Sequence, residues 1–348
     1  VILTEYEWMR RAIELAKQGE GWTNPNPMVG AVIVKDGKII GEGYHKKYGE
    51  LHAERNAIAS LTESAEGAVI YVTLEPCCHH GKTPPCTEAI IEQKIRKVVI
   101  GSRDPNPKVA GKGVQMLREA GVTVVEDFMR EECDQLNPVF FHYITTKTPY
   151  VVMKYAMTLD GKIATKTGAS KWITGESARK EVQHMRHQYM GIMAGIGTVL
   201  ADDPMLNVRV EGWKSPVRIV CDSKLRIPPD SQIVKSAEKY RTIVAYAEQK
   251  NAEEKIKILH TMGVETIYCP DEKNQIDLKK LMADLGNRGI DSILLEGGGT
   301  LNDSALRAGI VKEVQAFVAP KLFGGVAGKT PVEGIGVEFP SDAVELKY

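Results

Sequence analysis

Two stretches decide how the first half of this chain folds: HAE at residues 52–54 and TLEPCCHHGKTPPC at residues 73–86. A β-rich run leads into the second stretch, and a helical run follows its last cysteine. Histidine and cysteine are ligands that zinc prefers, and a catalytic zinc site needs three protein ligands and one open position. The pattern therefore predicts an α/β unit with a zinc site made by His52, Cys77 and Cys86.

Glu54 follows His52 by two residues, on the first turn of a predicted helix over Ala53–Leu61. From there its carboxylate can lie near the metal without ligating it, and it can carry a proton from water to a departing amine. A closed structural zinc site with Cys78 or His79 as fourth ligand is the alternative, but it has no need of that carboxylate. We therefore predict a zinc-dependent deaminase with Glu54 as its proton carrier.

The loop between the two cysteines is longer than deaminases usually have. Eight residues separate Cys77 from Cys86, where the usual pattern has two. Lys82 and the loop histidines can face a polar or anionic substrate, while Pro84 and Pro85 stiffen the return to the next helix.

Length and composition restrict the class of protein. A chain of 348 residues predicts two domains. Its 45 basic and 45 acidic residues cancel, which argues against a nucleic-acid coat or a polybasic membrane anchor. The six cysteines lack the even, dense spacing of a disulfide framework. The amphipathic start over residues 1–19 is not a signal peptide, and no membrane span follows. We expect a soluble, cytoplasmic protein.

Strand-like and helical runs alternate along both halves of the chain, which favours α/β architecture. The turn at residues 35–38 carries an Asp-Gly hairpin signal. A helical run from Glu131 to about Ile144 ends in a polar stretch closed by Pro149, and we place the domain boundary near residue 147. The predicted strands are Val29–Val34, Val69–Leu74, Lys97–Gly101 and Val122–Val125, then Tyr150–Lys154, Val217–Cys221, Thr242–Tyr246, Ser292–Leu295 and Val314–Val318. The other predicted helices are Thr87–Gln93 and Val114–Glu119.

The last third of the chain carries a glycine loop between a strand and a helix. Ser292–Leu295 runs into EGGGTL at residues 296–301. A strand that leads through glycines into a helix N-terminus presents backbone N–H groups to an anion, so a phosphate fits there. A plain tight turn is the alternative, because the motif is not the usual dinucleotide fingerprint.

Several motifs together resemble one known family. They are NPMVG at 26–30, HAE at 52–54, TLEPCCHHGKTPPC at 73–86, DPNP at 104–107, LDGKIA at 159–164, SKWIT at 170–174, and GTV with DDP between 197 and 204. They are similar to the bacterial bifunctional deaminase/reductases of riboflavin biosynthesis, and the likeness covers almost the whole chain. Cys78 stands where a serine is common, and the chain stops at Tyr348 inside what looks like a strand, short of the family's usual end.

The resemblance implies a fold and two consecutive reactions. The first domain, residues 1–147, would be a three-layer, cytidine-deaminase-like pyrimidine deaminase. The second, residues 148–348, would be an NADPH-dependent reductase of the dihydrofolate-reductase type with a central mixed sheet. The first step is hydrolytic deamination of 2,5-diamino-6-(5-phosphoribosylamino)pyrimidin-4-one, and the second reduces the ribosyl group to ribityl. One Zn²⁺ per chain and NADPH are the implied cofactors.

The resemblance also implies site residues. In the deaminase half, metal binding falls on His52, Cys77 and Cys86, catalysis on Glu54, and substrate contacts on Asn26, His45, His79, Lys82 and Asn106. In the reductase half, NADPH contacts fall on Ala156, Trp172, Thr198, Asp202, Ser223, Gly298, Gly299, Thr300, Leu301, Asn302, Asp303 and Ser304. Reductase substrate contacts fall on Lys154, Ser170, Arg186, Leu206, Arg209 and Glu296. Hydride transfer belongs to the nicotinamide, so we nominate no catalytic acid in this half; Lys154 and Glu296 are the candidates to test.

The residues alone leave simpler alternatives open for some positions. Asn26 can form a turn and His45 can be structural; Arg186 and Arg209 can be solvated charges, although guanidinium groups suit a phosphate monoester. Trp172 can be core, and Asp202 can be a cap.

Two rival functions differ in class. In one, the second domain is a non-catalytic binding module; in the other, the chain deaminates free bases or nucleic acid. An aromatic content of 6% offers little for base stacking. Low aromatic content and balanced charge argue against a nucleic-acid partner, and we expect no membrane partner. The resemblance implies small phosphorylated pyrimidines as substrates, and we expect a homo-oligomer.

Overall fold

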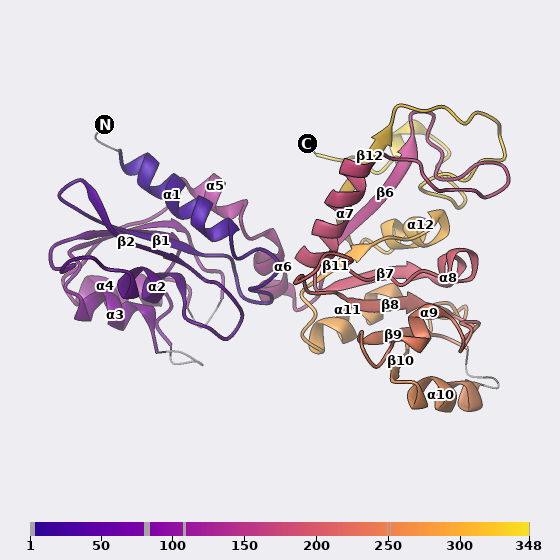
Figure 1. Cartoon of the computed structure of the whole chain (residues 1–348), viewed down its shortest axis with the longest axis horizontal. Helices are drawn as coiled ribbons and strands as arrows, with labels where there is room; N and C mark the ends of the chain where they lie inside the picture. The colour runs from indigo at the N-terminus through magenta and orange to yellow at the C-terminus, as the bar shows by residue number, and fades with distance from the viewer. Residues whose placement is uncertain (1–3, 80–83, 107–108, 249, 251, 348) are drawn as a thin grey trace. The chain divides into compact units, whose positions relative to one another are not determined.

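A computed structural model describes residues 4–79, 84–106, 109–248, 250 and 252–347. The chain divides into two compact units, residues 1–149 and 150–348 (Figure 1). The predicted boundary near residue 147 lies two residues before this division. None of the described helices is long and apolar enough to cross a membrane.

The first unit alternates strands and helices as the sequence predicts. Its elements are α1 (Glu5–Lys17), β1 (Gly30–Lys35), β2 (Lys38–Tyr44), α2 (Ala53–Ala59), β3 (Val69–Leu74), α3 (Cys86–Glu92), β4 (Lys97–Ser102), α4 (Lys112–Glu119), β5 (Thr123–Val125), α5 (Arg130–Asp134) and α6 (Pro138–Thr146).

The first sheet has the order β2-β1-β3-β4-β5. The β1–β2 hairpin is confirmed, and its turn residues Asp36 and Gly37 have φ of 48° and 74°, as a tight hairpin turn requires. β1 runs antiparallel to β3, while β3, β4 and β5 are parallel. The carboxyl ends of β3 and β4 therefore lie at one edge of the sheet.

Helices cover both faces of this sheet, which makes three layers (Figure 1). Met9, Ala12 and Cys133, from α1 and α5, pack on one face. Ala57 and Leu117, from α2 and α4, pack on the other, together with α3. This arrangement confirms the predicted three-layer first domain.

The predicted helix from Glu131 to about Ile144 is wrong as a single element. The structure has two helices there, α5 and α6, separated by residues 135–137. Pro138 lacks an N–H and begins the second helix at a position where none is needed. The side chain of Asn137 bonds the backbone N–H and carbonyl of Met28 at 2.7 and 2.8 Å, which fixes the break.

Two glycines of β2 let α2 approach the sheet closely. A Cβ at Gly41 would lie 2.5 Å from the carbonyl oxygen of Ala57, and one at Gly43 would lie 2.4 Å from the backbone nitrogen of Ala57. Both distances are shorter than real contacts allow. Because α2 carries Glu54, these glycines set how close the predicted proton carrier lies to the sheet.

The second unit repeats the α/β alternation. Its elements are β6 (Tyr150–Thr158), α7 (Glu176–Gln188), β7 (Gly191–Gly195), α8 (Ile196–Asp202), β8 (Val217–Cys221), α9 (Gln232–Lys235), β9 (Thr242–Tyr246), α10 (Ala252–Thr261), β10 (Val264–Tyr268), α11 (Leu278–Asn287), β11 (Ser292–Leu295), α12 (Gly299–Arg307), β12 (Val311–Ala319) and a final 3₁₀ turn, Pro340–Asp342.

The second sheet has the order β10-β9-β8-β7-β11-β6-β12. We expected a mixed sheet, but each pairing described in it is parallel. Leu281 of α11 and Ala305 of α12 pack in one core, and Val199 of α8 and Leu259 of α10 pack in the other. The strand expected at the end of the chain is not found, since residues 343–347 form no strand.

Candidate active sites

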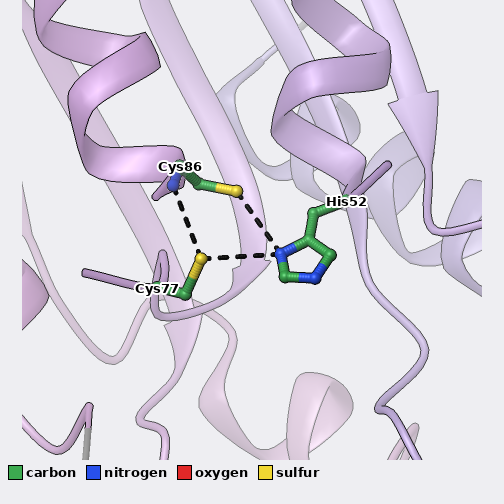
Figure 2. Close-up of side chains that lie close together, drawn as sticks. All are labelled: His52, Cys77 and Cys86. Atoms are coloured by element: carbon green, nitrogen blue, oxygen red, sulfur yellow. Dashed lines mark hydrogen bonds between the residues drawn. The ribbon is translucent and has the colours of Figure 1, made fainter. Parts of the chain in front are cut away.

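The three predicted zinc ligands come together beyond the carboxyl end of β3 (Figure 2). His52 caps the N-terminus of α2, Cys77 follows β3 by three residues, and Cys86 opens α3. The Nδ1 atom of His52 lies 3.5 Å from each of the two sulfur atoms. The backbone N–H of Cys86 also points to the Sγ of Cys77, at 3.4 Å.

These distances fit a tetrahedral zinc ion. With a Zn–S bond of about 2.3 Å and a Zn–N bond of about 2.0 to 2.1 Å, tetrahedral ligands lie about 3.6 Å apart. The observed separations of 3.5 Å match that value. One imidazole and two thiols are three ligands, which leaves the fourth position open as a catalytic site requires. The described residues supply no fourth His, Cys, Asp or Glu to this group.

Glu54 lies beside this ligand set and is 3% exposed. Burial, and then the charge of Cys77, raise the pKa of Glu54. A hydrogen bond with Cys86, together with His52, lowers the pKa of Cys77 to about 4. A buried carboxyl group next to a three-ligand site is the arrangement that the His-x-Glu spacing predicts.

Asn26 and His45 form a pair next to the predicted zinc ligands. The Nδ2 of Asn26 lies 3.2 Å from the Nε2 of His45, and the Nδ1 of His45 lies 3.0 Å from the carbonyl oxygen of Leu51. If Nδ1 carries the proton, then Nε2 accepts from Asn26, and the amide oxygen of Asn26 stays available as an acceptor. The His45 and His52 rings meet edge to face at 5.3 Å, so the structure brings both predicted substrate residues to the site.

The other predicted deaminase contacts have different surroundings. Asn106 is held by Asp104, whose Oδ1 accepts its backbone N–H at 2.8 Å, and burial raises the pKa of Asp104 to about 6. His79 is exposed. Lys82 lies outside the described residues.

Glu75 holds the turn before Cys77, and the sequence analysis missed it. Its carboxylate accepts the backbone N–H groups of Gly111 and Val114 at 3.1 and 3.4 Å, at the start of α4. A Cβ at Gly113 would lie 2.3 Å from the carbonyl oxygen of Pro76. α4 thus packs directly against the turn that presents Cys77.

The second unit contains a cavity of about 1060 Å³, at the upper end of the range for ligand sites. It lies at the carboxyl ends of β6, β7, β8 and β11, where open parallel sheets bind ligands. The predicted residues that line it are Lys154, Ala156, Ser170, Trp172, Arg186, Thr198, Asp202, Arg209, Ser223, Glu296, Gly298, Gly299, Thr300, Leu301 and Ser304.

Three predicted contacts do not lie in the cavity wall. Leu206 is buried in the core, and Asp303 pairs with Arg307 at 2.9 Å. Asn302 is fully buried, and its Nδ2 donates to the carbonyl oxygen of Pro331 at 2.8 Å.

A buried charge network occupies the cavity floor. Arg186 donates from Nε and Nη2 to the two carboxylate oxygens of Glu296 at 2.8 and 3.1 Å, and from Nη1 to the carbonyl oxygen of Asn207 at 3.0 Å. Lys154 Nζ lies 3.6 Å from Glu296. Burial alone would raise the pKa of Glu296, but Arg186 and Lys154 outweigh it and lower this pKa to about 2.

This shift predicts an acid-sensitive second unit. The folded-state pKa of Glu296 lies below its unfolded value, so its contribution to stability is complete above about pH 4.5 and is lost as the pH falls toward 2. We expect the free energy of unfolding of the second unit to fall across that window. Urea unfolding at a series of pH values checks this. Glu296→Gln should remove the fall in unfolding free energy that Glu296 causes between pH 4.5 and about 2, and an unchanged pH dependence would contradict the role given to Glu296.

Arg209 and Trp172 are two of the exposed residues of the cavity wall. Only the backbone N–H of Arg209 has a bond among the described contacts, to Gln183 at 2.8 Å, and its guanidinium has none. Trp172 is 59% exposed and lies under the guanidinium of Arg179, 4.7 Å from the ring centre. The core alternative for Trp172 is therefore wrong.

The glycine loop leads into α12 as predicted. Gly298 caps the helix, and Gly299 and Thr300 form its first turn. The Thr300 hydroxyl donates to Glu333 at 3.3 Å, and a Cβ at Gly299 would lie 2.4 Å from the Cγ of Glu333. A carboxylate of the last segment thus lies beside the helix start.

Basic residues that the sequence analysis did not select also line the cavity. Lys224 and Arg226 follow β8 directly, next to Ser223. The Nε of Arg226 lies 4.0 Å from a carboxylate oxygen of the buried residue Asp222. Their position just after a parallel strand is the sequence signal that could have identified them.

Comparison with known proteins gives two domain matches. Residues 4–102 match the cytidine and deoxycytidylate deaminase zinc-binding region. Residues 149–347 match the RibD C-terminal domain. The first match lies within the first structural unit, and the second begins one residue before the second unit.

Relatives of similar length match nearly the whole chain. The riboflavin biosynthesis protein RibD of Actinobacillus pleuropneumoniae is 58% identical over 99% of this chain and 91% of its own length. The Escherichia coli RibD is 41% identical over 98% and 94%. A solved Acinetobacter baumannii RibD structure superposes with a TM-score of 0.88 at 39% identity, covering 98% of this chain and 93% of that one. This chain belongs to the RibD family of riboflavin biosynthesis proteins.

Proposed function

We propose that this chain catalyses hydrolytic deamination of 2,5-diamino-6-(5-phosphoribosylamino)pyrimidin-4-one and then NADPH-dependent reduction of the product's ribosyl group to ribityl. A related Thermotoga maritima structure is described as a diaminohydroxyphosphoribosylaminopyrimidine deaminase/5-amino-6-(5-phosphoribosylamino)uracil reductase; it is 41% identical over 95% of this chain and 91% of that one, with a TM-score of 0.83. The observation that carries the proposal is the buried Glu54 beside an open His-Cys-Cys site.

In the first unit, His52, Cys77 and Cys86 would hold one zinc ion. When bound, zinc lowers the pKa of water toward 7. Glu54 is placed to take a proton from the attacking water and to give it to the departing amine. The amide oxygen of Asn26, oriented by His45, would accept an N–H of the pyrimidine.

In the second unit, the reduced nicotinamide supplies the hydride when it is bound, and the chain supplies binding and orientation. The backbone at Gly298–Leu301 would bind the cofactor diphosphate. Lys224 and Arg226 lie where a basic group can meet a 2′-phosphate, which favours NADPH over NADH. Lys154 and Glu296 would contact the ribosyl group.

Arg209, rather than Arg186, would bind the substrate phosphate, because Arg186 is already bonded to Glu296 and Asn207. We expect Arg209→Ala to raise the reductase KM roughly 10- to 100-fold, the effect of one charge-assisted hydrogen bond. The kcat should change little, and Arg209→Lys should recover part of the loss. Steady-state kinetics on the deaminated substrate tests this, with deaminase activity as the internal control; an unchanged KM would contradict it.

Metal removal tests the proposed zinc role. A protein treated with a chelator should release no ammonia from the diaminopyrimidine, and one equivalent of Zn²⁺ should restore it. Reductase activity should persist throughout, because its site draws no residue from the ligand set. Full deamination by demonstrably metal-free protein would refute the proposal.

A further inference from the structure

Arg55 connects two parts of the predicted metal site that lie about 30 residues apart in the sequence: the start of α2 and the segment just before Cys86. It follows Glu54 on α2, whose N-cap is His52. Its Nε donates to the carbonyl oxygen of Pro84 at 3.0 Å, and its Nη2 donates to that of Pro85 at 2.9 Å. These two prolines come directly before Cys86.

The chemistry of these contacts suits a fixed clamp. A guanidinium holds its donors in one rigid plane and stays charged, so it can bond two neighbouring carbonyl groups at once. Among the described residues, no carboxylate lies within ion-pair distance of Arg55, whereas other arginines of the first unit, Arg11 and Arg118, pair with acids. The described polar contacts of Arg55 are therefore those with the loop backbone.

The two prolines at the loop end are held through their carbonyl groups, which accept from Arg55. Prolines lack an N–H and cannot tie the segment down by donating. Cys86 itself bonds back to Cys77 through its backbone N–H at 3.4 Å. Arg55 therefore adds a link between α2 and the start of α3 to those made by the predicted ligands and by the core that the two helices share.

We propose that Arg55 is a positioning residue of the metal site: it fixes Pro84 and Pro85, and through them Cys86, against the helix that carries His52 and Glu54. This inference rests on the proposed zinc deaminase function. Loss of a group that orients a metal ligand typically costs about 10- to 100-fold in metal affinity or activity.

The test compares Arg55→Ala, Arg55→Lys and wild type as zinc-loaded full chains. We expect Arg55→Ala to release zinc to a coloured chelator about 10- to 100-fold faster, and to lower deaminase kcat at saturating zinc more than it changes KM. The cobalt-substituted variant should show altered thiolate–cobalt absorption. Arg55→Lys, with one ammonium in place of the fork, should recover part of both losses.

Two controls make the result decisive. Arg118→Ala removes an exposed arginine of the same unit, 53% exposed and paired with Glu126, and should match wild type. Reductase activity should be unchanged in all variants.

If Arg55→Ala only lowers the melting temperature, while zinc release and the cobalt spectrum of the folded protein stay as in wild type, the proposal is overturned. If wild type binds zinc but releases no ammonia, the deaminase assignment fails, and zinc release still decides the role of Arg55.

Discussion

Replacing Glu54 by glutamine is expected to lower deaminase kcat by about 10²- to 10⁴-fold, the usual contribution of a positioned proton carrier. Glutamine keeps the size of the side chain but cannot accept or return a proton. Zinc content should remain at one ion per chain, because Glu54 is not among the three ligands. The measurement is ammonia release per mole of zinc-loaded protein.

The control for this prediction lies in the same molecule. Reductase activity on the deaminated substrate should be unchanged in Glu54→Gln, since the cavity of the second unit contains no residue of the first. Ammonia release within tenfold of wild type, at equal zinc content, would remove Glu54 from the mechanism and revive the structural zinc alternative.

Replacing Glu296 by glutamine should destabilise the second unit by about 3–5 kcal/mol, because it leaves two buried cations without their counter-charge. The side chains of Arg186 and Glu296 are each 13% exposed, and that of Lys154 is 11% exposed. Reductase activity should be lost as well. Calorimetry should show a lower melting transition for the second unit, with the transition of the first unit identified by its shift on zinc removal.

Glu265→Gln is the matched control for this prediction. Glu265 also pairs with two cations, Arg241 at 2.7 Å and Arg288 at 3.0 Å, but its side chain is 38% exposed. Exposed ion pairs contribute only about 0–1 kcal/mol. The melting transition of the second unit should therefore scarcely move in Glu265→Gln. Equal effects of the two substitutions would mean that the Glu296 network is not a buried, mutually dependent set.

The sequence predicted the parts of this protein in which local pattern and chemistry agree. Strands such as Val69–Leu74 and Val217–Cys221 have the predicted bounds, because each is a short apolar run between turn signals. The grouping of His52, Cys77 and Cys86 was predictable because His-x-Glu followed by two cysteines is a pattern that serves few purposes besides a zinc site. The hairpin followed from the Asp-Gly pair between two strand-like runs.

The features that the sequence did not predict depend on contacts between residues far apart in the chain. The break between α5 and α6 depends on Asn137, which bonds Met28 across more than a hundred residues. Arg186 lines the cavity, as a substrate contact would, and only the structure shows that its guanidinium also bonds Glu296 and Asn207. Arg55 and Glu75 act on backbone groups far along the chain, so no local motif marks them.

The central claim is that one chain carries two consecutive reactions, and a coupled assay tests it most directly. Zinc-loaded protein is mixed with the phosphoribosylamino-diaminopyrimidine and NADPH, while ammonia and reduced-nicotinamide absorbance are followed together. We predict ammonia first and NADPH loss after a lag, with Glu54→Gln consuming NADPH only when it is given the deaminated product. NADPH loss without prior ammonia release, or no ammonia from folded, zinc-loaded protein, would contradict the account.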